Sequence, residues 1–306
     1  MQSIFVETSN QILCLFLIVV IGFIIKKTGV VNDKMDTCVS QLQSNVIMPA
    51  LVFQAFYKNF KIDVLTEKSL FLIVGAVVVV ITNILSIWLA KLFSKDRFIR
   101  NIYSYSFTVS NLGYMGYSVV GAVFGEEALF NMMIFCIPFN VYIYSIGIAI
   151  LNPNNPKVSF KTLINPVFCA MILGAVIGII NIRLPEVIVT TCSNLAACMG
   201  PLAMLVAGFV IAKYDIKELF GYKKVYVASL IRLVAIPGIV VLVMKAFGAG
   251  TDILICAVGT LAMSLGLNTV IFPAAYGGDT KTGASMALIS NILGVVTIPL
   301  MFALAL

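Results

Sequence analysis

The sequence predicts an all-α integral membrane protein, because it is far too apolar for a soluble domain. Hydrophobic residues make up 61% of the 306 residues and charged residues only 11%, and the mean hydropathy is +1.07. Soluble domains are about half apolar and about a quarter charged. Long apolar runs recur along the whole chain, so we expect no sizeable soluble domain.

Ten of these runs are long enough to cross a membrane as helices, since a crossing requires about 20 largely apolar residues. We therefore predict ten transmembrane spans, near residues 9–27, 38–56, 69–93, 98–124, 127–151, 163–181, 186–212, 223–246, 252–277 and 281–305.

The segment NPNNPK at 152–157 separates the first five spans from the last five, because its two prolines stop a helix. We predict a first five-helix repeat over 1–151, a linker over 152–162 and a second repeat over 163–306. Since five is an odd number, the two repeats face opposite ways across the membrane.

Short matches in the same order in both halves favour this inverted repeat. NVIMPALVFQAF at 45–56 corresponds to ACMGPLAMLVAGF at 197–209, and VIGFII at 20–25 resembles VIGIIN at 176–181. Each match alone is weak, but together they have a nearly constant offset.

Spans four and nine are the two that combine asparagine with glycine, as SNLGYMG at 110–116 and SLGLNTVIFP at 264–273. In transporters, interrupted spans at corresponding positions of inverted repeats mark the substrate site. An interruption exposes helix N-termini, whose free N–H groups and positive dipole suit an anion. We predict that Asn111 and Asn268 satisfy freed backbone groups or contact the substrate.

A simpler interpretation exists for the glycines of span four. Small residues let neighbouring membrane helices approach closely, and Gly113, Gly116 and Gly121 could serve only that purpose.

Basic residues in the loops predict the orientation. Fourteen of the twenty Lys and Arg residues lie in the odd-numbered loops and five lie in the even-numbered loops, with the last, Arg232, inside a span. Loops rich in Lys and Arg stay in the cytoplasm, so both termini are predicted outside.

Motifs spread over the whole chain resemble the auxin efflux carrier family, which includes bacterial malonate and malate permease-like members. They are KKTG after the first span, NVIMPALVF in the second, NLGYMGYSVVGAVFGEEAL in the fourth, PLAMLVAGF in the seventh, RLVAIPG in the eighth and YGGDTKTGASM entering the tenth. The resemblance implies two inverted five-helix repeats, a scaffold domain and a transport domain, and a homodimer through the scaffold helices. It also implies that helices four and nine cross, with an organic anion bound near the crossing and carried by an elevator-type motion.

The sequence departs from the family pattern at two positions. Ser118 and Ser264 stand where relatives often have proline, which would enforce the breaks. Glycine and asparagine must produce the interruptions here, while both serines add hydroxyl donors. The candidate substrate-binding residues are Asn111, Gly113, Tyr114, Gly116, Tyr117, Ser118, Ser264, Asn268, Thr269, Asn45 and Arg232.

Arg232 is the ionisable residue placed deepest in a span, about 12 Å along the helix from Lys224 at 1.5 Å per residue. Burying an arginine in a membrane costs at least about 2.5 kcal/mol, so it requires a partner. It either attracts a carboxylate substrate, or extends to the cytoplasmic headgroups or ties helix ends together.

The sequence does not decide which ion, if any, is coupled to transport. The chain has no histidine and its acids lie in termini, loops or span edges, so we predict no carboxylate-driven cation antiport. Proton coupling through Glu126, Glu127 or Asp279 competes with ordinary capping or solvent exposure of these acids. Sodium coupling needs only backbone, Ser, Thr or Asn oxygens. No other cofactor is expected.

The sequence lacks the residues that nucleic-acid-binding proteins, zinc or haem proteins and intramembrane enzymes require. The net charge of +7 comes from short pairs of basic residues beside spans, with no stripe suited to nucleic acid. Seven scattered cysteines without a CxxC, and no histidine, make zinc or haem sites improbable. Paired carboxylates within spans and a GxSxG elbow are absent, so we predict no enzyme.

We therefore expect a secondary transporter of small mono- or dicarboxylates such as malate or malonate, embedded in the lipid of the cell membrane. A sodium-coupled symporter of the bile-acid transporter type, or an anion channel on the same scaffold, is the alternative.

Overall fold

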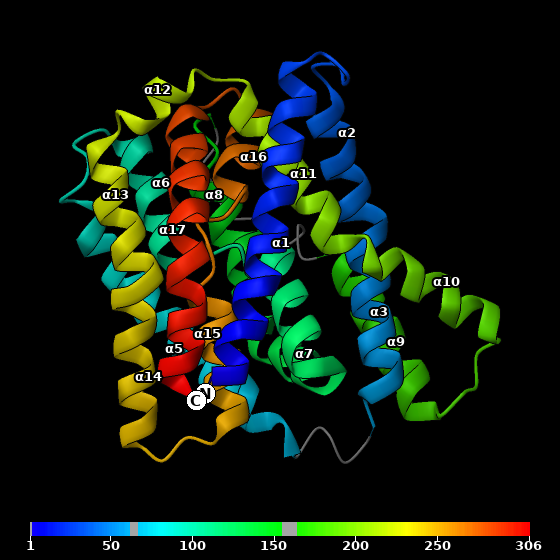
Figure 1. The fold of residues 1–306 in the computed structure, drawn as a ribbon. Helices are drawn as coiled ribbons and strands as arrows, with labels where there is room; N and C mark the ends of the chain where they lie inside the picture. The colour runs from blue at the N-terminus through cyan, green and yellow to red at the C-terminus, as the bar shows by residue number, and fades with distance from the viewer. Residues whose placement is uncertain (1, 62–66, 155–163) are drawn as a thin grey trace.

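The computed structural model describes residues 2–61, 67–154 and 164–306, and this part of the chain is almost entirely helical (Figure 1). Within it, the extended pairing is a single isolated antiparallel bridge between Ser110 and Leu265. The prediction of an all-α protein is confirmed for these residues. Most of the predicted linker, residues 155–162, lies outside the described residues.

The helices of the first half follow the predicted spans closely. They are α1 (Gln2–Lys27), α2 (Met35–Leu42), the π-helical η1 (Gln43–Ile47), α3 (Met48–Asn59), α5 (Ser69–Ala90), α6 (Arg97–Thr108), η2 (Leu112–Gly116), α7 (Tyr117–Tyr142), η3 (Ile143–Gly147) and α8 (Ile148–Ile150). The segments α2, η1 and α3 join end to end, as do η2, α7, η3 and α8.

The described part of the second half is also helical. Its helices are α9 (Pro166–Ile180), α10 (Glu186–Ala197), α11 (Met199–Ala212), α12 (Ile216–Phe220), α13 (Lys223–Leu230), η5 (Ile231–Ala235), α14 (Ile236–Ala246), α15 (Thr251–Leu261), α16 (Asn268–Ala275) and α17 (Lys281–Ala305). The short helix α12 falls where the sequence analysis placed a loop.

In the described residues, six helical stretches are long and apolar enough to cross a bilayer: 4–27, 69–90, 112–150, 186–212, 223–246 and 281–305. Their outward faces carry many exposed apolar side chains, such as Leu17 on α1, Trp88 on α5 and Leu242 on α14. Water-facing surfaces rarely show such continuous apolar area. The described helices are therefore those of a multi-pass membrane protein.

The longest of these helices, 112–150, is folded back on itself at Gly125. That residue has φ 88° and ψ 179°, a conformation open essentially to glycine alone. Asn140 Nδ2 lies 3.5 Å from the Tyr117 hydroxyl, whereas 23 residues of straight helix would separate them by about 34 Å. The segment is thus a helical hairpin, with its turn where the sequence predicts the boundary between spans four and five.

Two close helix pairs join the halves of the chain. A Cβ atom added to Gly22 on α1 would lie 2.5 Å from the carbonyl oxygen of Leu205 on α11, and one added to Gly178 on α9 would lie 2.6 Å from that of Phe60 next to α3. Helices α1 and α11, and α3 and α9, accordingly pack along much of their length. Both glycines belong to the matched VIG segments of the sequence.

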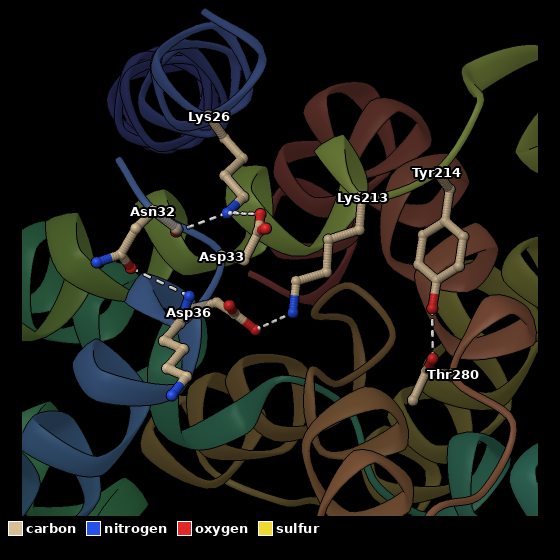
Figure 2. Close-up of polar contacts among 8 residues, drawn as sticks. Lys26, Asn32, Asp33, Asp36, Lys213, Tyr214 and Thr280 are labelled. Carbon is tan, nitrogen blue, oxygen red and sulfur yellow. Dashed lines mark hydrogen bonds and ion pairs between the residues drawn. The ribbon is translucent and has the colours of Figure 1, made fainter. Parts of the chain in front are cut away.

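Both chain termini lie at one end of the bundle (Figure 1). At the other end, polar contacts connect loops from both halves (Figure 2): Lys213 Nζ lies 2.7 Å from Asp36 Oδ2, and the hydroxyls of Tyr214 and Thr280 are hydrogen-bonded. Lys26 Nζ lies 3.0 Å from Asp33 Oδ1, and this ammonium group lowers the pKa of the Asp33 carboxyl through its hydrogen bond.

Candidate functional site

The two interrupted segments meet inside the bundle. Helix α6 ends at Thr108 and the chain becomes helical again at Leu112, while α15 ends at Leu261 and the chain becomes helical again at Asn268. The intervening residues run antiparallel: Ser110 bridges Leu265. The interruptions predicted in spans four and nine are therefore present, and they lie side by side.

Hydrogen bonds between these two connections fix their position. The Asn111 amide donates to the Ser264 carbonyl oxygen at 2.8 Å, and the Ser110 hydroxyl donates to the Thr260 carbonyl oxygen at 2.6 Å. The Leu265 amide donates to Ser290 Oγ on α17 at 2.9 Å. Buried backbone groups released by the breaks are satisfied in this way.

Each interruption presents the N-terminus of a helix. The amides of Met115 and Gly116 both donate to the Asn111 carbonyl oxygen, at 3.0 and 3.1 Å, while those of residues 112–114 begin the helix and have no carbonyl partner within it. The Asn268 amide begins α16 in the same way. Two helix starts, each with the positive end of its dipole, thus face one small region.

This region is a cavity of about 30 Å³, which we call the crossover cavity. It is lined by Met48, Ser110, Asn111, Leu112, Gly113, Tyr114, Asn140, Ile143, Tyr144, Gly266, Leu267 and Asn268. Four candidate residues from the sequence, Asn111, Gly113, Tyr114 and Asn268, are among them. That volume has room for a water molecule, which needs about 10–15 Å³.

The two asparagines are held differently. Asn268 Nδ2 donates to the buried Tyr105 hydroxyl at 2.8 Å, which orients its carboxamide. Asn111 is buried, and its Oδ1 has no hydrogen-bond partner among the described residues. An unpaired buried acceptor costs free energy. The Asn111 side chain therefore gains more than Asn268 from a hydrogen-bond donor or a cation that enters the cavity.

A second, larger cavity has a volume of about 450 Å³, and we call it the vestibule. Its lining comes from α1, α3, α7, α10 and α11, and includes the candidates Tyr117 and Ser118. Ser118 Oγ donates to the Tyr114 carbonyl oxygen at 3.0 Å. At the vestibule wall, Lys58 Nζ lies 3.0 Å from Glu126 Oε1, which connects α3 to α7.

Three candidates occupy packing positions. A Cβ on Gly116 would lie 2.6 Å from the Gly259 carbonyl oxygen, so this glycine permits the close approach of α15. Ser264 is fully buried, with its hydroxyl 3.3 Å from Met115 Sδ. Thr269 donates to the Gly266 carbonyl oxygen at 2.9 Å. None of the three lines the crossover cavity or the vestibule.

Asn45 and Arg232 are not among the residues that line the crossover cavity. Asn45 is exposed and its Nδ2 donates to the Gln41 carbonyl oxygen at 2.8 Å, within its own helix. Its neighbour Ser44 instead reaches the cavity region, with its hydroxyl 3.4 Å from that of Tyr114. Arg232 is fully buried and lines neither cavity.

The acids at the ends of the interrupted spans have structural partners. Glu127 lies 3.6 Å from Lys68, and Glu126 pairs with Lys58 as described above. Asp279 Oδ1 accepts from the Lys281 amide at 3.0 Å, which caps α17. These contacts favour capping and ion pairing over proton carriage.

Sequence reasoning missed Tyr105, Ser44 and Asn140. Tyr105 orients Asn268, and Asn140 belongs to the cavity lining although it comes from span five. Tyr105 lies in span four but before its Asn–Gly motif, and tyrosine is common at membrane interfaces, so only the spatial arrangement shows what these residues contact. No group of three potential metal ligands among His, Cys, Asp and Glu occurs in the described part of the chain.

Comparison with known proteins identifies the family. A family model described as membrane transport protein matches residues 8–302. An uncharacterized transporter of Methanothermobacter thermautotrophicus is 25% identical over 216 residues, covering 68% of this chain and 69% of that protein. The uncharacterized transporter YfdV of Escherichia coli is 19% identical over 306 residues, covering 95% of each. The chain therefore belongs to the membrane transport protein family, the auxin efflux carrier family that its motifs resemble.

Proposed function

We propose that this chain is a secondary transporter that binds a small carboxylate, such as malate or malonate, between the two helix starts at the crossover. The observation that carries the proposal is the pairing of Asn111 and Asn268 with two N-terminal helix ends around one cavity. Free amides and positive dipole ends bind anions in many proteins, and they bear no net charge that would hold a carboxylate too tightly to release.

The carboxamides add directed donors to these amides. Each asparagine side chain carries two N–H donors, and hydrogen bonds to an ionised acceptor are shorter and about twice as strong as neutral ones. A carboxylate at this position therefore accepts from both halves of the chain simultaneously. Such a bidentate arrangement distinguishes a carboxylate from a spherical halide.

The size of the crossover cavity requires a conformational change. At about 30 Å³ it is far below the about 300 Å³ at which ligand sites usually begin, whereas the vestibule, at about 450 Å³, is large enough. Tyr117 and Ser118 line the vestibule one turn beyond Tyr114. We propose that substrate enters the vestibule and reaches the asparagines when Tyr114 moves.

The packing of the bundle supports an elevator-type motion within an inverted repeat. Helices α1, α3, α9 and α11 form the two close pairs described above, and they are our proposed scaffold. The interrupted segments, with the hairpin at Gly125 and α17, are the proposed transport domain. The vestibule lies between these two groups, which is where relative movement would open a path.

Sodium coupling is a second candidate, favoured by one observation. Among the described residues, Asn111 Oδ1 is a buried oxygen without a hydrogen-bond partner, and Asn111 lines the cavity of about 30 Å³. Hard cations bind oxygen ligands, and an ion without its water shell fits such a volume. A sodium ion there would also attract a carboxylate.

Uptake into proteoliposomes tests the proposal. Purified protein is reconstituted and given a panel of labelled mono- and dicarboxylates, with and without sodium and pH gradients. We expect saturable uptake of at least one small carboxylate, and a carrier rather than a channel predicts accelerated exchange when unlabelled substrate is present inside. Absence of uptake for the whole panel, or flux that follows voltage without saturation, contradicts the proposal.

A further inference from the structure

Arg232 is a buried cation that the proposed carboxylate site does not use. It lies in η5, midway along the helix formed by residues 223–246, and has no exposed surface. Helix segments α17 and α6 pack against η5, and Figure 1 shows α13, α14 and α17 side by side. Its burial excludes the expectation that the side chain extends to lipid headgroups.

The N–H groups of the Arg232 guanidinium find no hydrogen-bond acceptor among the described residues. In the described residues, Nε, Nη1 and Nη2 of Arg232 all lack a hydrogen-bond partner, and none of the ion pairs found there includes Arg232. Buried charges in proteins are normally paired, and an arginine inside a membrane span pairs with another group or lines a functional site.

A second orphaned donor lies on the same face of the helix. Ser229 is fully buried and its hydroxyl also lacks a partner among the described residues. Residues three apart on a helix are neighbours on its surface, and Ser229 and Arg232 both belong to the buried face of this helix. Together they form a set of buried donors that have no hydrogen-bond acceptor in the part of the chain that the structure describes.

We propose that Ser229 and Arg232 form a binding site for a small inorganic anion of the halide class, separate from the crossover cavity. The donor set matches the chemistry of an anion, because a guanidinium group offers five N–H donors and the hydroxyl adds one. Neither residue lines the vestibule or the crossover cavity, which favours a compact ion over a dicarboxylate. The bound anion neutralises the charge of Arg232 and fixes η5 against α6 and α17.

Halide-dependent thermal stability of the purified protein tests this site without any transport measurement. Sodium bromide is titrated against sodium methanesulfonate at constant ionic strength, so only the kind of anion changes. A ligand that binds the folded state raises the melting temperature with the logarithm of its concentration above Kd. We expect a rise of several degrees with bromide, and an anomalous scattering peak beside Arg232 in crystals containing bromide.

Three variants locate the effect. Arg232→Met fills the same space without a charge, and such replacements of buried ions are often tolerated, so it should fold and lose the bromide response. Ser229→Ala should shift the response about tenfold or more toward higher bromide. Arg183→Gln, on an exposed arginine, is the matched control and should respond like the parent protein.

The proposal is overturned if the parent protein shows no bromide-specific stabilisation, or if Arg232→Met and Ser229→Ala respond as the parent does. Either result leaves the carboxylate proposal untouched, since that proposal depends on Asn111 and Asn268.

Discussion

At the scale of residues, the crossover depends on two asparagines that the sequence analysis identified by their pairing with glycine in both halves. The residues around these asparagines are not predictable in the same way. Tyr105, which orients Asn268 at 2.8 Å, lies in an ordinary helical stretch. Ser44 contacts the Tyr114 hydroxyl rather than an asparagine, and it is one position from Asn45, the candidate that the sequence predicts. A one-residue step along a helix turns a side chain by about 100°, which local sequence patterns in span two do not resolve.

Replacing either crossover asparagine should weaken transport. Hydrogen bonds to charged groups contribute about 1.5–3 kcal/mol, and about 1.4 kcal/mol corresponds to a factor of ten. Asn111→Ala and Asn268→Ala are therefore each expected to lower the initial rate of carboxylate uptake, at substrate concentrations below KM, about ten- to a hundredfold.

Asn45→Ala is the matched control, since this asparagine is exposed and bonded within its own helix. It should transport at the parent rate. Full activity in both crossover variants, with normal folding by circular dichroism, would remove the asparagines from the site.

At the scale of elements, glycines fix where helices turn and how closely they pack. The sequence predicts the breaks in spans four and nine without the prolines common in relatives. The structure gives the physical reason that they form: the connections bridge each other at Ser110 and Leu265, and the Asn111 amide bonds to the Ser264 carbonyl oxygen. Pairing between the halves replaces proline, which no single-span pattern could reveal.

The turn of the helical hairpin should depend on glycine at position 125. Alanine there adds a Cβ with nothing within 4 Å, so the change affects only the backbone, which has φ 88°. Residues held in such conformations cost about 1–3 kcal/mol. We expect Gly125→Ala to lower the melting temperature in detergent.

The comparison for this variant is Gly250→Ala, at a glycine with φ −69° that is equally free of neighbours. It should have little effect. Equal melting temperatures for the two variants would mean that the hairpin turn at Gly125 differs from the one described.

Close packing between α1 and α11 should likewise depend on Gly208. A Cβ there would lie 2.2 Å from the Val19 carbonyl oxygen, and forcing extra volume into a packed interface costs about 1–3 kcal/mol. Gly208→Ala should therefore destabilise the protein in thermal unfolding.

Gly238→Ala on α14 is the control and should not destabilise the protein. A Cβ added at Gly238 would have the methyl group of Met301 as its nearest neighbour, at 4.0 Å. Alanine favours a helix over glycine by up to about 1 kcal/mol, so this variant should be as stable as the parent or slightly more so. A Gly208→Ala protein as stable as Gly238→Ala would contradict the packing of α1 on α11.

At the scale of the whole molecule, helical segments occupy all ten predicted ranges in the described residues, and several bounds coincide, as for 186–212, 223–246 and 281–305. The ends of long apolar runs can be predicted from the sequence, because hydropathy and length alone define a membrane span. The vestibule and its Lys58–Glu126 pair could not be predicted, since they depend on how α3 lies against α7.

The distribution of basic residues predicts that both termini are outside the cell, and Figure 1 places them at one end of the bundle. A carboxyl-terminal alkaline phosphatase fusion, which folds only outside the cytoplasm, should be active, while a green fluorescent protein fusion at the same position should be dark. A bright fluorescent fusion with an inactive phosphatase fusion would reverse the orientation.

The most direct measurement is a structure of the protein determined with a saturating concentration of a transported carboxylate, compared with one determined without it. The account predicts additional density between the helix starts at Leu112 and Asn268, within hydrogen-bonding distance of both asparagine side chains, in an enlarged crossover cavity. Density confined to the vestibule, or next to Arg232, with the crossover unchanged, would contradict it.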